Sequence, residues 1–245
     1  MHSNLVITIL AAGEGKRMNS SIPKVLHIFQ GKPMLVRIVE TAISLEPQKI
    51  IIVTGKYDKM IQETISEHID LVKNNIIFVV QTIPQGTGDA IKHCLTHYNI
   101  HQKVLILNGD MPLINKTILR TFIENSKDAT ILVAKFENPF GYGRIVYDNN
   151  GEFVKIVEEK DCSEDERQIN IVNSGLYLLN SDILHMYIPK IGNDNSQKEY
   201  YLTDIVKLIK KDAEIKINTY QIDETDNKYI SGVNTPDELM NLSLA

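Results

Sequence analysis

The chain has 245 residues with 43% hydrophobic side chains and a formal net charge of −5, so it can bury a large core but has no global basic field for nucleic-acid binding. Its two cysteines, Cys94 and Cys162, form no CxxC pair, which argues against a disulfide framework and a structural zinc site. The sequence shows neither the pattern of a secretory leader nor an apolar run of membrane-spanning length. We therefore expect a cytoplasmic protein with no nucleic-acid and no membrane partner.

Five short apolar runs in the first half predict the strands of a mostly parallel sheet. Between them, apolar residues recur at helical spacing over 33–39, 60–65 and 91–95, which predicts crossover helices. Because the strands are apolar at nearly every position, we expect helices on both faces of the sheet. The predicted strands are LVITIL (5–10), KIIIVT (49–54), IIFVV (76–80), KVLILN (103–108) and TILVAK (130–135).

After residue 136 the pattern changes to that of a mixed lobe. We predict a hairpin that turns at 149–151, then a polar segment containing SEDE, which suits a capping box or a solvated turn, and then a strand over 169–180. Ser181 is expected to cap a helix over 182–188, and another helix is expected over 202–211. We find no internal repeat and no long linker, so we expect a single domain over 1–245.

The stretch LAAGEGKRMNSSIPKVL (10–26) combines glycines with cations directly after the first predicted strand. Ligands of open α/β sheets lie at the carboxyl ends of strands, where Gly13 and Gly15 would allow close backbone approach and Arg17 and Lys24 would supply cationic donors. The spacing fits neither a Walker P-loop nor the GxGxxG dinucleotide fingerprint. An anion-binding loop and an ordinary basic surface loop are both compatible with these residues.

Seven motifs follow one another over residues 5 to 240. They are LAAGEGKRM with PKVL, QTIPQGTGDA (81–90), NGDMPL (108–113), GYGRI (141–145) with IVEEKD (156–161), IVNSG (171–175), EYYLTD (199–204) and GVNTP (232–236). These motifs resemble those of the sugar-nucleotide pyrophosphorylases, which join a nucleoside triphosphate to a sugar 1-phosphate. Their order is most similar to that in the uridylyltransferase domain of the bacterial bifunctional enzyme that makes UDP-N-acetylglucosamine. The hexapeptide-repeat acetyltransferase domain of that enzyme has no counterpart here, so acetyl transfer is not expected.

The resemblance implies an α/β fold with a Rossmann-like, mostly parallel central sheet, helices on both faces and a small mixed β sugar-binding lobe. The nucleotide-binding part would cover about 4–135, the sugar-binding lobe about 136–230 and a C-terminal helix about 235–243. The uracil would contact Gln81, Gly86 and Thr87, although these residues alone could be a polar turn with Thr87 as a helix N-cap. The other nucleotide-binding residues implied are Leu10, Ala11, Ala12, Gly13, Asn108 and Gly109; Asn108 stands where the closest relatives usually have Tyr.

The same resemblance implies a Mg²⁺ site and a set of phosphate-binding cations. Asp110 and Asn234 would be the metal ligands, a carboxylate and an amide oxygen that suit magnesium. Arg17 would hold the departing pyrophosphate, and Lys24 would lie over the reacting phosphates, which makes Arg17, Lys24 and Asp110 the catalytic candidates. Taken singly, Asp110 could instead begin an Asx-turn, and Asn234 could cap the helix that starts near Pro236.

Sugar binding is implied for Glu158 and Asn173, which would contact the hydroxyl and acetamido groups beside the backbone of Gly143. Tyr200 and Thr203 would close the sugar-phosphate side, whereas Tyr201 and Leu202 are expected in the core. Without the resemblance, a Glu and an Asn in a mixed hairpin would be solvated surface residues. In the same motif, Tyr142 could pack in a tight turn while Arg144 pairs with a carboxylate.

The expected reaction is UTP plus N-acetylglucosamine 1-phosphate to UDP-N-acetylglucosamine plus pyrophosphate, by in-line, Mg²⁺-assisted nucleotidyl transfer. One alternative is a uridylyl- or thymidylyltransferase for glucose 1-phosphate or another sugar 1-phosphate. Another is a catalytically silent regulatory protein that binds UDP-sugars, which the presence of Arg17, Lys24, Asp110 and Asn234 disfavours. We expect a monomer or a small homo-oligomer.

Overall fold

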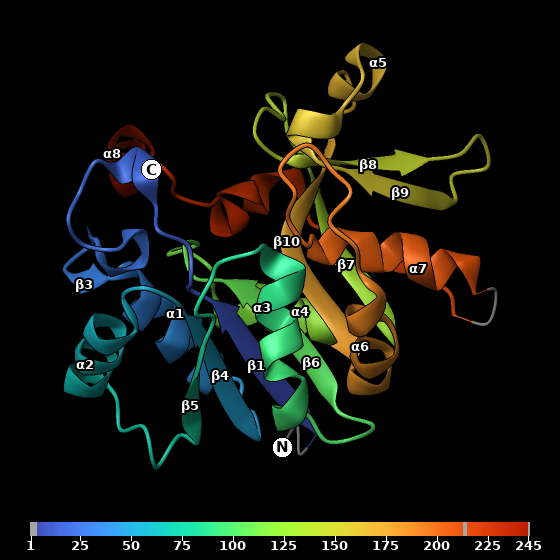
Figure 1. The fold of residues 1–245 in the computed structure, drawn as a ribbon. Helices are drawn as coiled ribbons and strands as arrows, with labels where there is room; N and C mark the ends of the chain where they lie inside the picture. Colours follow the sequence, from blue (N-terminus) through green and yellow to red (C-terminus); the bar gives the residue numbers. More distant parts are fainter. Residues whose placement is uncertain (1–3, 213–214, 245) are drawn as a thin grey trace.

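The computed structural model describes residues 4–212 and 215–244, and one mixed sheet forms its centre (Figure 1). Its main strands lie in the order β11-β7-β10-β6-β1-β4-β5, and every neighbouring pair is parallel except the two that β10 forms. The prediction of a mostly parallel α/β sheet is therefore confirmed. The five predicted strands are β1 (Leu5–Leu10), β4 (Lys49–Thr54), β5 (Ile76–Val80), β6 (Lys103–Asn108) and β7 (Ala129–Lys135).

Helices cover both faces of this sheet, because successive strand residues point to opposite sides. Leu5, Ile7 and Ile9 of β1 belong to one buried cluster, which α1 (Met34–Ile43), α2 (Asp58–His68) and α4 (Lys116–Asn125) complete. Val6 belongs to the other cluster, together with α3 (Thr87–Cys94), α6 (Ser181–Tyr187) and α7 (Ile205–Lys211). None of the described helices is long and apolar enough to cross a membrane.

The second half of the chain contributes both to the sheet and to a separate hairpin. Strand β10 (Ile171–Asn180) lies between β6 and β7 and is antiparallel to both, and β11 (Asn218–Gln221) pairs with the outer edge of β7. The predicted hairpin is formed by β8 (Gly143–Tyr147) and β9 (Phe153–Val157) and extends from the start of β10 (Figure 1). The range 136–230 thus also supplies two strands of the central sheet.

Short elements complete the chain and show where local sequence reasoning succeeded. The SEDE segment forms the one-turn helix α5 (Glu164–Arg167) with the predicted capping box between Ser163 and Glu166. The helix predicted over 202–211 is a 3₁₀ turn at 202–204 followed by α7. The strands β2 (Ile28–Phe29) and β3 (Lys32–Pro33) form a small antiparallel pair, and α8 (Pro236–Leu244) is the last described helix.

The prediction that Ser181 caps α6 is wrong. Asn180 holds the N-cap position and no side chain caps the helix. Ser181 is fully buried, and its hydroxyl oxygen instead accepts a hydrogen bond of 3.0 Å from the backbone N–H of Gln102. A tertiary contact to the loop before β6 has taken the oxygen that a local cap would use.

Candidate active site

Two adjoining cavities lie at the carboxyl ends of β1 and β6, where a parallel sheet of this class places its ligands. The first cavity, of about 390 Å³, is lined by residues of the loop after β1 and of the loop before α3. The second cavity, of about 620 Å³, is lined by residues near the β8–β9 hairpin and by residues of α8. Asn108, Asp110 and Glu158 line both cavities and so mark their junction.

At this junction, Lys24 joins two residues that are far apart in the sequence. Its ammonium donates hydrogen bonds to Oδ2 of Asp110 and, over 3.0 Å, to Oδ1 of Asn234. The side chains of Lys24 and Asp110 are only 14% and 18% exposed. Gly15 has φ +64°, and a Cβ built on it would overlap the Cβ of Lys24, so a glycine is required there for Lys24 to reach this position. Three predicted residues are thus brought together.

The segment before α8 explains how Asn234 reaches the site with a side-chain oxygen that is not used to cap the helix. The N–H of Val233 donates to the backbone oxygen of Asp110 over 2.9 Å. The hydroxyl of Thr235 accepts the N–H of Glu238 (3.2 Å), and the Glu238 carboxylate accepts the N–H of Asn234 (2.6 Å). Thr235 therefore caps α8, so the alternative of Asn234 as the helix cap is not what the structure shows.

The loop before α3 forms the far wall of the first cavity. Gln81 is 2% exposed, and its amide donates to the backbone oxygen of Gly86 (3.1 Å) and to Oδ2 of Asp89 (2.7 Å). Gly86, with φ +108°, holds the N-cap position of α3, so Thr87 is not that cap. Gln81, Gly86 and Thr87 all line the cavity, as do Leu10, Ala11, Ala12, Gly13 and Asn108.

Glu158 is a carboxylate that lines both cavities. Its side chain accepts a hydrogen bond of 3.0 Å from the hydroxyl of Thr203, and burial raises the pKa of its carboxyl group above the ordinary value of 4.5. A Cβ at Gly143 would lie 3.2 Å from Cγ2 of Ile156 and in ordinary contact, at 3.5 Å, with both Glu158 carboxylate oxygens, so the Gly143 backbone lies beside this carboxylate. Asn173 lines the same cavity, and its amide donates to the hydroxyl of Tyr177 over 2.7 Å.

Two tyrosines of this region have hydroxyl groups whose pKa is raised. Burial raises the pKa of Tyr177 and that of Tyr142, whose hydroxyl also hydrogen bonds with the Gly232 backbone. Tyr142 packs edge-on against Phe136, with ring centroids 4.9 Å apart, and Arg144 pairs with Glu159 over 2.7 Å. The packing of Tyr142 and the ion pair of Arg144 that the sequence left open are therefore both present, and Tyr142 also lines the second cavity.

Other predicted residues lie at the margin of the site. Arg17 is exposed and lines the second cavity, and Gly109 packs against the Leu10 backbone. Tyr200 is not among the described residues that line either cavity, whereas Tyr201, expected only in the core, is buried and lines the first. Thr203 is connected to the site by the hydrogen bond that its hydroxyl donates to Glu158.

Sequence reasoning missed Glu199 and the role of Gly175. Glu199 lines the first cavity, although only its place at the start of the EYYLTD motif pointed to it and no role was predicted for it. Gly175 has φ +80°, and a Cβ there would overlap the amide nitrogen of Asn108, so the glycine is what lets Asn108 lie at the junction. The signal was available, since a lone glycine inside a strand indicates a bulge or a close approach, and the β10–β7 register shifts between Asn173 and Tyr177.

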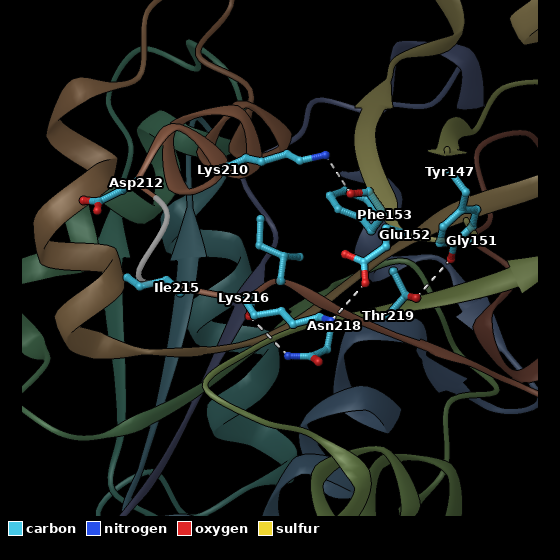
Figure 2. A pocket seen from close by; sticks show the side chains of 11 residues that line it. Tyr147, Gly151, Glu152, Phe153, Lys210, Asp212, Ile215, Lys216, Asn218 and Thr219 are labelled. Carbon is cyan, nitrogen blue, oxygen red and sulfur yellow. Dashed lines mark hydrogen bonds and ion pairs between the residues drawn. The ribbon is translucent and has the colours of Figure 1, made fainter. Parts of the chain in front are cut away.

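A further cavity, of about 470 Å³, lies under the β8–β9 hairpin beside α7 and β11 (Figure 2). Its described side chains bond mostly to one another: Lys216 to Glu152 over 3.3 Å and Tyr147 to Thr219 over 3.0 Å. None of the described lining residues is a predicted site residue. The candidate active site is therefore the pair of cavities that meet at Asp110.

The chain is similar to known proteins over nearly its whole length. The chain is 44% identical over 241 residues to the "Probable UDP-N-acetylglucosamine pyrophosphorylase" of Acanthamoeba polyphaga mimivirus, covering 96% of this chain and 93% of the relative. It is 39% identical to the "Bifunctional protein GlmU" of Psychrobacter sp. (strain PRwf-1), with 99% of this chain covered, and spans 51% of that relative's length.

A solved structure and a family profile complete the comparison. The crystal structure of HddC from Yersinia pseudotuberculosis, complexed with GMP-PN, shares the fold with a TM-score of 0.68 at 22% identity, over 98% of each chain. The profile of the family described as "Nucleotidyl transferase" matches residues 6–227. The chain therefore belongs to the nucleotidyl transferase family.

Proposed function

We propose that the protein transfers the uridylyl group of UTP to N-acetylglucosamine 1-phosphate, which yields UDP-N-acetylglucosamine and pyrophosphate. The observation that carries the proposal is the Lys24, Asp110 and Asn234 cluster at the junction of two cavities. With the nucleotide in the first cavity and the sugar in the second, the α-phosphate of UTP and the phosphate of the sugar 1-phosphate would meet at the cluster. The relative from mimivirus, by its name, supports this choice of product.

The residues at the junction fit a magnesium ion. Asp110 and Asn234 direct a carboxylate and an amide oxygen at one ammonium group, so together they already hold a cation of the chain itself. Oxygen ligands of this kind suit Mg²⁺, which keeps several waters and takes its remaining ligands from phosphates. When bound there, the ion would neutralise charge on the phosphate oxygens.

In the proposed reaction an oxygen of the sugar 1-phosphate forms a bond to the α-phosphorus of UTP. The bond between the α-phosphorus and the oxygen that bridges it to the β-phosphorus breaks, and pyrophosphate leaves with the electron pair of that bond. The attacking oxygen is already anionic near neutral pH, so no general base is needed. The chain contributes position and charge: Lys24 would stabilise the reacting phosphoryl group, and Arg17, with the backbone N–H groups near Gly13, would hold the pyrophosphate.

Recognition of the two substrates would be divided between the cavities. Gln81, Gly86 and Thr87 line the wall where a uracil would lie, and the buried amide of Gln81 is fixed by two hydrogen bonds. Glu158 and Asn173 line the other cavity, where a carboxylate and an amide can bind sugar hydroxyl and acetamido groups. The cytoplasmic location and the monomeric or small homo-oligomeric state stay predictions.

The deciding experiment measures pyrophosphate release from UTP with Mg²⁺ and a panel of sugar 1-phosphates. We expect N-acetylglucosamine 1-phosphate to have the highest kcat/KM, above glucose 1-phosphate, and UTP to be preferred over dTTP. A preference for glucose 1-phosphate or dTTP would favour another sugar nucleotide as the product. If the protein bound UDP-N-acetylglucosamine but released no pyrophosphate with any donor pair, it would be a binding protein instead.

A further inference from the structure

A short segment connects the two cavities and is held at the first turn of α3. This bridging segment consists of residues 199–203. The N–H of Tyr200 donates to the backbone oxygen of Gln85 over 2.7 Å, and the N–H of Gly88 donates to the backbone oxygen of Tyr200 over 2.7 Å. The second bond satisfies one of the N–H groups that the start of every helix leaves without an intrahelical partner.

A third hydrogen bond and a buried anchor make the bridging segment rigid. The N–H of Leu202 donates to the hydroxyl oxygen of Thr87 over 3.0 Å. Leu202 is 2% exposed and Ile205, at the start of α7, is 1% exposed, and both belong to the core cluster that contains α3. A shift at the α3 end must therefore move the segment as a unit, because close-packed interiors do not absorb it locally.

Gly88, in the first turn of α3, packs against the backbone of the bridging segment. A Cβ built on it would lie 2.9 Å from the backbone oxygen of Tyr200 and 3.2 Å from the backbone carbon of Tyr201. Both are backbone atoms, so only a displacement of the bridging segment or of α3 would make room. Gly88 is not among the described residues that line either cavity.

The other end of the bridging segment contacts the proposed sugar-binding carboxylate. The hydroxyl of Thr203 donates to Oε1 of Glu158 over 3.0 Å, and Glu158 lines both cavities. Tyr201, between the two ends, lines the first cavity. A continuous chain of contacts thus runs from the nucleotide-side loop through the bridging segment to Glu158.

We propose that Gly88 is a positioning residue for the sugar-binding end of the site, acting through the bridging segment and Thr203 on Glu158. This inference rests on the proposed function. It assigns the close approach of α3 and the bridging segment a role in setting affinity for the sugar 1-phosphate. The bridging segment adds only Glu199 and Tyr201 to the nucleotide cavity, whereas the proposed uracil contacts Gln81, Gly86 and Thr87 lie outside the segment, so UTP binding would depend on it less.

The test is the variant Gly88→Ala, assayed for the KM of each substrate. Alanine is favoured over glycine inside helices, so helix propensity predicts no loss of stability, and an effect on the sugar substrate must come from the contact with Tyr200. We expect the KM for the sugar 1-phosphate to rise by at least about fivefold, because small misplacements of binding groups have large effects, and the KM for UTP to change by less than about twofold.

Gly192→Ala is the matched control, because a Cβ at Gly192 meets nothing within 4 Å. It should leave both KM values unchanged. Thr87→Val removes the acceptor for Leu202 together with a hydroxyl at the proposed uracil wall, so it should raise the KM for the sugar 1-phosphate as well as that for UTP, and Thr87→Ser should restore both. An unchanged KM for the sugar 1-phosphate in Thr87→Val would contradict the proposal. These two variants keep the proposal testable if Gly88→Ala does not fold.

A double-mutant cycle tests the route through Thr203. If Gly88 acts on Glu158 through that hydroxyl, Thr203→Val removes the effect in advance, and adding Gly88→Ala should raise the KM for the sugar by less than about twofold more. Additive effects, or equal increases in both KM values, would overturn the proposal. An inactive wild-type protein would instead contradict the proposed function, whereas an active one with an unchanged Gly88→Ala variant contradicts only this inference.

Discussion

At the residue scale, the Lys24 ammonium occupies the place that a divalent cation would need, because it binds the side-chain oxygens of Asp110 and Asn234. A metal ion entering the free protein must displace this ammonium. We therefore expect Lys24→Met to bind Mn²⁺ more tightly than the wild type in the absence of nucleotide, by at least about tenfold, since one positive charge in contact with the site is lost. Titration of free Mn²⁺ by electron paramagnetic resonance measures this directly.

Arg17→Met is the control for Lys24→Met, because it removes a positive charge that lines the second cavity but lies on the exposed loop. A general effect of charge would raise Mn²⁺ affinity alike in both variants and would contradict direct competition. In assays of turnover, Lys24→Met should be slower by about two to three powers of ten, as for the loss of a preorganised donor. Tighter metal binding and slower turnover would then appear in one variant.

At neutral pH, Glu158 should make the folded protein less stable than an uncharged side chain would in its place. Burial raises the pKa of its carboxyl group above 4.5, so the ionised form is disfavoured in the folded state at neutral pH, and this loss disappears as the pH falls through the raised pKa. We expect Glu158→Gln to have a higher Tm than the wild type at about pH 7.5, with the difference shrinking toward about pH 5. A difference independent of pH would contradict this origin.

Part of the candidate site could be predicted from the sequence. The motifs pointed to Arg17, Lys24, Asp110 and Asn234, and hydrogen bonds in the structure join the last three. The sequence suggested that Gly15 gives room to a ligand, but in the structure it gives room to Lys24. In the same loop, Lys16 and Glu14 form an ion pair at 3.6 Å, with Lys16 exposed and Glu14 half-buried. Such contacts depend on backbone conformation, which residue types alone do not determine.

At the scale of elements, Glu159 joins the hairpin to its surroundings. Its carboxylate binds the guanidinium groups of Arg144 and Arg167, each over 2.7 Å, and accepts the N–H of Gly141 over 3.1 Å. Arg144 is 2% exposed, so its charge has no access to water. We expect Glu159→Gln to lower the free energy of unfolding by about 3 kcal/mol, because it leaves a buried charge unpaired, as urea denaturation would measure.

Arg167→Gln provides the comparison, since it removes the exposed partner of the same carboxylate. The Arg167 side chain is 45% exposed, and pairs of this kind contribute less than about 1 kcal/mol. If both variants lost the same stability, the burial of Arg144 would not be the cause. The pairing of Arg144 was foreseen as an alternative in the sequence, but its burial was not, because burial depends on the whole fold.

Elements were predictable where their own pattern defines them. β1, β4, β5 and β6 have the predicted bounds, because buried parallel strands are apolar at nearly every position. β11 was missed, since its four residues are half-buried or exposed at a sheet edge. The antiparallel place of β10 also could not be predicted, because strand order is set by contacts between segments far apart in the chain.

At the scale of the whole molecule, the fold brings together the loop after β1, the turn after β6 and the segment before α8. Hydrogen bonds of Lys24 join residues from all three. The proposed nucleotide and sugar cavities share Asn108, Asp110 and Glu158, so one bound molecule can contact both parts. A product that spans the junction should therefore stabilise the protein more than either of its halves.

UDP-N-acetylglucosamine at about 100 times its Kd should raise the free energy of unfolding by about 2.7 kcal/mol, which corresponds to a Tm increase of about 5–10 °C for a chain of this size. UDP at the same concentration should give a smaller increase, because it leaves the second cavity empty. Glu158→Gln should lose the difference between the two ligands while it keeps the response to UDP. Equal thermal shifts for UDP and UDP-N-acetylglucosamine in the wild type would mean that the second cavity does not bind the sugar.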